Sequence, residues 1–181
     1  MAVEYARSDD DYSDVRPLNE VVCDFYNSAT FTSAEFNADC GVSEIRALFR
    51  IEATLNAHSG WGATVRPIVL KPNNGAPTYF CEDENGLTPA TGRDPIIGGL
   101  SYISSTWRQA KIKCDFWIDD NGRVHFVSEC VRAHTAGQFQ IQRHVGCAES
   151  LLGARVTSFH LSTTGGVSFD INSIVRIARV F

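Results

Sequence analysis

Hydrophobic and polar side chains alternate along residues 45–55 with a period of two. The first set of positions is apolar throughout: Ile45, Ala47, Phe49, Ile51, Ala53 and Leu55. The second set is mostly polar: Arg46, Leu48, Arg50, Glu52 and Thr54. Successive side chains of a strand point to opposite faces, so this pattern predicts a strand with one buried face. Residues 58–62 then turn the chain, and residues 65–70 are predicted as a second strand, in which Pro67 indicates a sheet edge or a bulge.

A hairpin is predicted where residues 112–118 and 124–131 flank the turn segment 119–123. A two-residue turn at Asn121-Gly122 would set Cys114 opposite Glu129. A three-residue loop with Gly122 in a bulge pairs compatible side chains on both faces. The register that this loop sets is therefore preferred. Its pairs are Ile118 with Val124, Phe116 with Phe126, Cys114 with Ser128, Ile112 with Cys130, Lys113 with Glu129 and Trp117 with His125.

A second hairpin is predicted near the C-terminus around a loop at residues 164–166. It pairs Thr163 with Val167, Leu161 with Phe169, Phe159 with Ile171, Ser162 with Ser168 and His160 with Asp170. Residues 139–145 and 174–181 are predicted as further strands. The chain is therefore expected to be all-β and mainly antiparallel, a sandwich or barrel of about eight strands with at most one or two short helices.

The chain divides into an N-terminal arm, residues 1–17, and a single β-rich domain, residues 18–181. The arm is acidic through Asp9, Asp10, Asp11 and Asp14, and a segment of this composition is disordered when it is alone. We therefore expect contact with a neighbouring subunit to order it, with Arg46 and Arg50 as possible partners of the aspartates. Within the domain, residues 71–101 are rich in Pro and Gly and are predicted as a long loop, with a short strand at 78–81.

The charge balance limits the kinds of partner that are expected. The chain has 16 Lys and Arg against 21 Asp and Glu, a formal net charge of −5. Its basic residues are scattered, whereas nucleic-acid binding needs clustered cations, so no nucleic-acid partner is expected. No stretch approaches the roughly 20 apolar residues that span a bilayer, and the first residues lack the pattern of a conventional signal peptide. The expected partner is another copy of the chain or another protein, and the location is left open, with export or a place in a particle both admissible.

Cysteine and histidine positions were considered as disulfide or metal sites. The six cysteines, at positions 23, 40, 81, 114, 130 and 147, permit three disulfides but form no Cys-x-x-Cys. Buried cysteine behaves as a small apolar side chain, so mostly free thiols are favoured over a disulfide framework. His125, His134 and His144, together with Glu129, are candidates for a metal cluster, but His125 and Glu129 would lie about 13 Å apart on a strand. No metal site and no cofactor are therefore expected.

Two groups of side chains are candidates for function. His160 and Asp170 form the best acid–base pair, because a carboxylate beside an imidazole orients it for proton transfer. No nucleophile or metal motif accompanies them, and the alternative is an exposed ion pair. The second group consists of aromatic residues in or beside predicted loops: Trp61, Tyr79, Tyr102 and Trp107. Such side chains provide rigid contact area for a partner, or alternatively fill the core beneath the long loop.

Several short segments occur in a characteristic order: Val65-Arg66-Pro67-Ile68, Gly92-Arg93-Asp94, Gly99-Leu100-Ser101, Ser105-Thr106-Trp107-Arg108, His144-Val145-Gly146, Leu152-Gly153-Ala154 and Thr164-Gly165-Gly166. In this order, the chain over residues 65–173 resembles a bacterial family of uncharacterised domains met in secreted and toxin-associated proteins. The resemblance implies an all-β fold, and the family has no activity to transfer.

The function expected from the sequence is non-enzymatic. The acidic arm, the lack of a catalytic motif and the loop aromatics favour a β-rich binding or structural module, foremost a subunit of a homo-oligomeric assembly of virion, tail or filament type. The alternative is a secreted effector or toxin domain, whose enzymatic activity would be tested first at His160 and Asp170.

Overall fold

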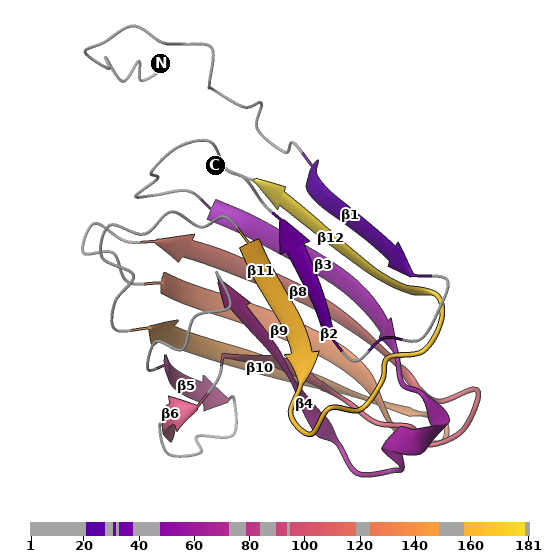
Figure 1. The fold of residues 1–181 in the computed structure, drawn as a ribbon. Helices are drawn as coiled ribbons and strands as arrows, with labels where there is room; N and C mark the ends of the chain where they lie inside the picture. Colours follow the sequence, from indigo (N-terminus) through magenta and orange to yellow (C-terminus); the bar gives the residue numbers. More distant parts are fainter. Residues whose placement is uncertain are drawn as a thin grey trace, which may run out of the picture.

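The computed structural model describes residues 21–27, 31, 33–37, 48–72, 79–83, 90–93, 95–118, 124–148 and 158–179. In this part of the chain, two antiparallel sheets pack face to face (Figure 1). The large sheet has eight strands in the order β1-β12-β3-β8-β9-β10-β5-β6, and the small sheet has four in the order β2-β11-β4-β7. The predicted all-β, antiparallel architecture is confirmed as a sandwich, and the sheets do not close into a barrel.

The strands of the large sheet are β1 (Val21–Asn27), β12 (Ser173–Arg179), β3 (Leu48–Asn56), β8 (Gln109–Ile118), β9 (Val124–Thr135), β10 (Gln138–Ala148), β5 (Tyr79–Asp83) and β6 (Ala90–Arg93). Those of the small sheet are β2 (Ser33–Asn37), β11 (Ser158–Thr163), β4 (Arg66–Pro72) and β7 (Ile96–Leu100). Five strands of the large sheet and three of the small one form the body of the sandwich, in agreement with the expected number. The strands β1, β2, β5 and β6 extend its edges. Within the described residues, the 3-10 turn η2 (Ser59–Trp61) is the only helical element.

The core lies between the two sheets. Along β3 every second residue is buried, at Phe49, Ile51, Ala53 and Leu55, as the alternation predicted. Aromatic rings join the layers, because the ring centroid of Phe159 on β11 lies 5.5 Å from that of Phe49 and 5.8 Å from that of Phe116. Burial of each such ring stabilises the fold by about 1.5–3 kcal/mol.

The strand β7 comes close to the large sheet at a glycine. A Cβ atom at Gly98 would lie 2.9 Å from the Cβ of Cys130 and 3.1 Å from the Cδ1 of Ile112. Nearby, Ser128 Oγ donates a hydrogen bond of 2.8 Å to the carbonyl oxygen of Ile97. Because this space is already filled, a larger residue at Gly98 would push β7 away from β8 and β9.

The hairpin of β8 and β9 has the register that the sequence predicted. All the predicted partners stand opposite each other: Ile118 and Val124, Trp117 and His125, Phe116 and Phe126, Cys114 and Ser128, Lys113 and Glu129, and Ile112 and Cys130. Cys114 and Cys130 are buried free thiols, and burial raises the pKa of both. Cys147 is also free. The turn at 119–123 and the thiols of the other three cysteines lie outside what the structure describes.

The predicted C-terminal hairpin is wrong. A turn is present at residues 164–166, with Gly165 and Gly166 in the left-handed region at φ 101° and 64°. The chain does not fold back onto β11, however, because β11 pairs with β2 and β4 while β12 pairs with β1 and β3 in the other sheet. The connecting segment instead inserts Phe169 into the core, where its ring centroid lies 5.0 Å from that of Phe31 and 5.5 Å from that of Trp61.

Residues 71–101 are not a continuous loop. They contain β5, which agrees with the short strand predicted at 78–81, and also β6 and β7. The adjacent strand β4 lies between β11 and β7, so the edge position considered for Pro67 is wrong. The pairing of β4 with β7 shifts between Ile68 and Val69, next to Pro67, as expected for the bulge. The arm, residues 1–17, lies outside the described residues.

Candidate functional site

A row of alternating charges crosses the outer face of the large sheet. Its five exposed residues stand side by side on neighbouring strands: Arg176 of β12, Glu52 of β3, Lys113 of β8, Glu129 of β9 and Arg143 of β10. Arg143 Nε donates to Glu129 Oε2 at 3.2 Å. Cross-strand pairs of opposite charge contribute about 0.2–1 kcal/mol each. The charge row therefore favours a single register of these strands.

A shallow groove of about 490 Å³ lies over the charge row. Its lining includes Glu52, Lys111, Lys113, Glu129 and Arg176. Cations and carboxylates are mixed in this lining, and Lys113 stands between the carboxylates of Glu52 and Glu129. Phosphate binding needs clustered cations, and a calcium or magnesium site needs converging oxygen ligands. The groove is therefore the space between long charged side chains rather than a site for an ion.

Arg50 on β3 already has an anionic partner. Its Nε and Nη2 donate to the two carboxylate oxygens of Asp115 on β8, at 2.8 and 3.0 Å. The hydrogen bonds that Arg50 donates to Asp115 raise the pKa of its guanidinium. Forked pairs of this kind are among the stronger ion pairs of proteins. Arg50, suggested from the sequence as a partner of the acidic arm, is thus engaged within its own sheet, and Arg46 lies outside the described residues.

On either side of the charge row, the outer face of β9 and β10 carries apolar side chains. We call this surface the β9–β10 strip, and its apolar members are Val127, Val131, Phe139, Ile141 and Val145. Four of them are exposed: Phe139 by 65%, Ile141 by 57%, Val127 by 46% and Val145 by 43%. Val127 stands opposite Val145 and Val131 opposite Ile141, with the pair of Glu129 and Arg143 between them. Exposed apolar side chains gathered on one face in this way mark a place where another surface binds.

Trp107 extends the β9–β10 strip at the end where Phe139 lies. The ring centroids of Trp107 and Phe139 are 5.5 Å apart, in an edge-to-face arrangement. A tight turn holds the indole there, because the backbone N–H of Trp107 donates to the carbonyl oxygen of Ser104 at 3.2 Å. Of the four aromatic residues proposed from the sequence as binding residues, Trp107 is thus the one that joins this surface.

The other proposed aromatic residues do not line it. Trp61 is 2% exposed, and its Nε1 donates to the carbonyl oxygen of Ser168, so it fills the core. Tyr102 is half-buried against the core. The side chain of Tyr79 on β5 lies outside what the structure describes. For Trp61 and Tyr102, the core-filling alternative is therefore correct.

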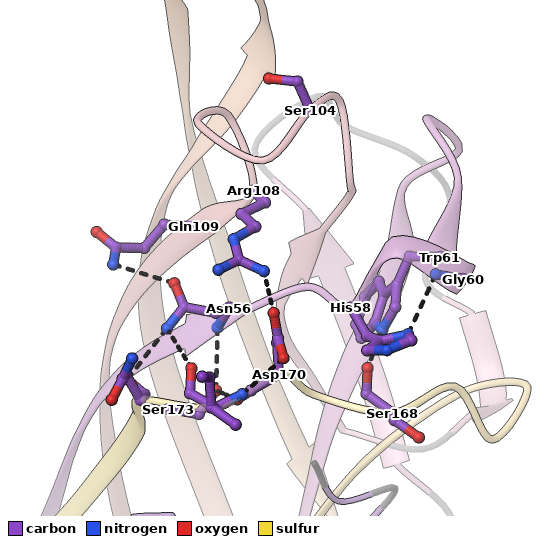
Figure 2. A network of polar contacts seen from close by, with 12 residues as sticks. Asn56, His58, Gly60, Trp61, Ser104, Arg108, Gln109, Ser168, Asp170 and Ser173 are labelled. Atoms are coloured by element: carbon purple, nitrogen blue, oxygen red, sulfur yellow. Dashed lines mark hydrogen bonds and ion pairs between the residues drawn. The ribbon is translucent and has the colours of Figure 1, made fainter. Parts of the chain in front are cut away.

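A polar network at one end of the sandwich joins β3, β8 and the entry to β12 (Figure 2). Asn56 Nδ2 donates to the carbonyl oxygens of Ile171 and Asn172 at 3.3 and 3.0 Å, and Asn56 Oδ1 accepts from Gln109 Nε2 at 3.2 Å. The backbone N–H of Asn56 donates to Ser173 Oγ at 3.1 Å. Asn172 has a left-handed backbone, with φ 63°. Each polar group of Asn56 is bonded to another part of the fold, so the network anchors the chain where it enters the large sheet.

The acid–base pair proposed from the sequence is not formed. Asp170 belongs to the polar network, where Arg108 Nη1 donates to its Oδ2 (Figure 2). His160 lies on β11, in register between Glu35 of β2 and Lys71 of β4. The two residues are separated because the connecting segment leaves the small sheet instead of folding back along β11. The pairing of His160 with Asp170 is therefore wrong, and with it the geometry on which that catalytic candidate depended.

The three histidines considered for a metal site have different surroundings, so they do not form one site. His125 stacks on Trp117 on the outer face, with ring centroids 5.3 Å apart. His144 is buried, and His134 is exposed. No group of three or more ligating side chains converges among the residues that the structure describes.

A buried arginine at the end of β9 was missed from the sequence. Arg132 is 4% exposed, and burial lowers its pKa. Its Nε donates to Gln142 Oε1 at 3.1 Å, its Nη1 to the carbonyl oxygen of Ala133 at 3.2 Å, and its Nη2 to Gln140 Oε1. The bonds to Gln140 and Gln142 tie β9 to β10 on the face opposite the strip. The sequence did carry a signal for its burial, because Arg132 falls on the same face of the strand as Phe126, Ser128 and Cys130.

Comparisons with protein-family models, curated proteins and solved structures find no significant match to this chain. In the part that the structure describes, no helix is long and apolar enough to cross a membrane.

Proposed function

We propose that this protein is a non-enzymatic assembly module that associates with copies of itself through the β9–β10 strip. The observation that carries the proposal is the exposure of four apolar residues on one face of the large sheet, on either side of the pair of Glu129 and Arg143: Val127, Phe139, Ile141 and Val145. Covering apolar surface is the main driving force of protein association. A second copy that covers the strip would gain this free energy without any rearrangement of the domain.

The composition of the strip fits a protein partner. Aromatic residues and arginine are enriched at protein interfaces, and Trp107, Phe139 and Arg143 lie together on this face. The acidic arm, residues 1–17, would add a second contact between copies, for example by pairing with an exposed strand edge. A homo-oligomeric particle or filament, of virion or tail type, is the setting that this proposal favours.

The test is the mass of the full chain in solution at micromolar concentration, by light scattering after size exclusion. The wild-type protein is expected to be oligomeric, and Ile141→Ser is expected to lower its mass. Ile174→Ser is the matched control, because Ile174 is exposed on the same face of the large sheet but lies on β12, away from the strip. A monomeric wild-type chain, or an equal effect of the two substitutions, would contradict the proposal.

A further inference from the structure

The β9–β10 strip has a symmetry that specifies how a second copy would fit onto it, an inference that rests on the self-association proposed above. Three successive cross-strand pairs form its centre, Val127 with Val145, Glu129 with Arg143, and Val131 with Ile141, and Phe139 follows opposite Ala133. In each pair, the residue on β9 is chemically complementary to the residue on β10. The strip is therefore complementary to its own image when β9 and β10 are exchanged.

We propose that two copies pack face to face about a two-fold axis that runs parallel to the strands, midway between β9 and β10. Half a turn about this axis keeps each position along the strand and exchanges β9 with the partner's β10. Glu129 then faces the partner's Arg143, and Arg143 faces the partner's Glu129. The apolar residues face the partner's apolar residues on either side of these ion pairs. Such an isologous contact closes on itself, and aligned sheets pack about 10 Å apart.

Two alternative two-fold axes produce poorer contacts on the same face. An axis perpendicular to the strands along the charge row would place Glu129 on the partner's Glu129 and Arg143 on the partner's Arg143. An axis parallel to the strands but between β8 and β9 would place Val127 on the partner's Asp115 and Val145 on the partner's Arg50, since these four residues share one row. The first arrangement sets like charges together, and the second buries an ion pair against valines.

The test is a charge exchange between copies, measured as the dimer dissociation constant of the full chain. Glu129→Arg alone gives a chain with cations at both position 129 and position 143. Arg143→Glu alone gives a chain with anions at both positions. Each variant by itself is expected to dimerise roughly a hundredfold more weakly than the wild type, because both symmetric contacts become repulsive. An equimolar mixture of the two is expected to regain dimers, since each cation then faces an anion of the other chain.

The mixture distinguishes contacts between copies from contacts within one chain. Both variants lose their internal pair of Glu129 and Arg143, so a purely intramolecular role would leave the mixture as weak as its components. Arg176→Glu is the matched control: it makes the same charge change in the same row, but on β12, beyond the reach of the partner's sheet. Its dimerisation should equal that of the wild type.

Each outcome bears on the two proposals separately. A monomeric wild type would overturn the proposed function. If the wild type dimerises and each variant dimerises as tightly as the wild type, self-association stands but the two-fold arrangement is overturned. Weakened variants whose mixture stays monomeric would also overturn the arrangement. The side chains of Glu129 and Arg143 are about half exposed, so the variants are expected to fold, and unfolding curves with Glu129→Gln as a milder variant check this.

Discussion

Arg108 and Asp170 form an ion pair across 62 positions of sequence, which joins the start of β8 to the segment that enters β12. Asp170 Oδ1 also accepts from the backbone N–H of Ile171 at 2.9 Å. Asp170→Asn leaves one acceptor oxygen for these two donors, so we expect it to lower the free energy of unfolding by about 1–2 kcal/mol. Urea unfolding monitored by tryptophan fluorescence measures the change.

Two comparisons make this prediction specific. Arg143→Gln, which removes the cation of a more exposed ion pair, should lower the free energy of unfolding of the monomer by under about 0.5 kcal/mol. Arg108→Gln and Asp170→Asn should be less than additive when combined, because both remove the same interaction. Additive losses would show that the two residues stabilise the fold independently.

Trp61 and Trp107 are predicted to act in different processes. Trp61→Ala should destabilise the fold by about 3–5 kcal/mol, since it empties a core position next to Phe169 and leaves the carbonyl oxygen of Ser168 without its donor. Trp107→Ala should change the unfolding midpoint little but weaken self-association, because the indole contacts Phe139 at the end of the β9–β10 strip. Unfolding curves and solution mass, measured on both variants, separate the two effects. The opposite pattern would mean that Trp107 belongs to the core.

The buried thiol of Cys114 predicts a loss of stability at alkaline pH. Burial raises its pKa in the folded state, whereas the unfolded chain releases the proton near the ordinary value of about 8.5. Below about pH 8.5, the contribution of the buried thiol to the free energy of unfolding is fully present. Between the two pKa values, the folded state binds more protons than the unfolded state. The free energy of unfolding therefore falls as the pH rises above about 8.5.

The variant that tests this is Cys114→Ala, which removes the titrating group. It is expected to lose less of its stability than the wild type between about pH 7 and about pH 10, whatever its stability at neutral pH. Cys114→Ala combined with Cys130→Ala should flatten the dependence further, because burial also raises the pKa of Cys130. Identical pH dependence in all three proteins, followed by urea midpoints, would exclude the thiols as its cause.

The acidic arm is predicted to contribute to assembly rather than to folding. Its larger apolar residues are few, Val3, Tyr5, Tyr12 and Val15, and burial of each contributes at most about 1.5–3 kcal/mol. Ordering the backbone costs about 1–2 kcal/mol per residue, so these anchors alone cannot hold the arm. Deletion of residues 2–16 should leave the unfolding midpoint nearly unchanged and lower the solution mass. An unchanged mass would remove the arm from the assembly.

The sequence predicted the parts of this fold that depend on neighbouring segments. The register of β8 and β9 followed from the side chains that a tight turn brings together, and it placed Cys114 and Ile112 on the buried face. The alternation along β3 likewise identified its buried residues, because successive side chains of a strand point to opposite faces. In both cases, the information lies within a few tens of residues.

Only the tertiary structure decided which strands β11 and β12 pair with and which face of β9 and β10 stays exposed. The apolar matches that suggested a hairpin between β11 and residues 167–171 were outweighed by the burial of Phe169 beside Phe31 and Trp61, which are distant in sequence. The path of this segment also places Asp170 beside Arg108, away from its expected partner His160. The strip is decided in the same way. Alternation shows that β9 and β10 each have two faces, but only the position of the small sheet determines which face it covers and which apolar residues remain in water.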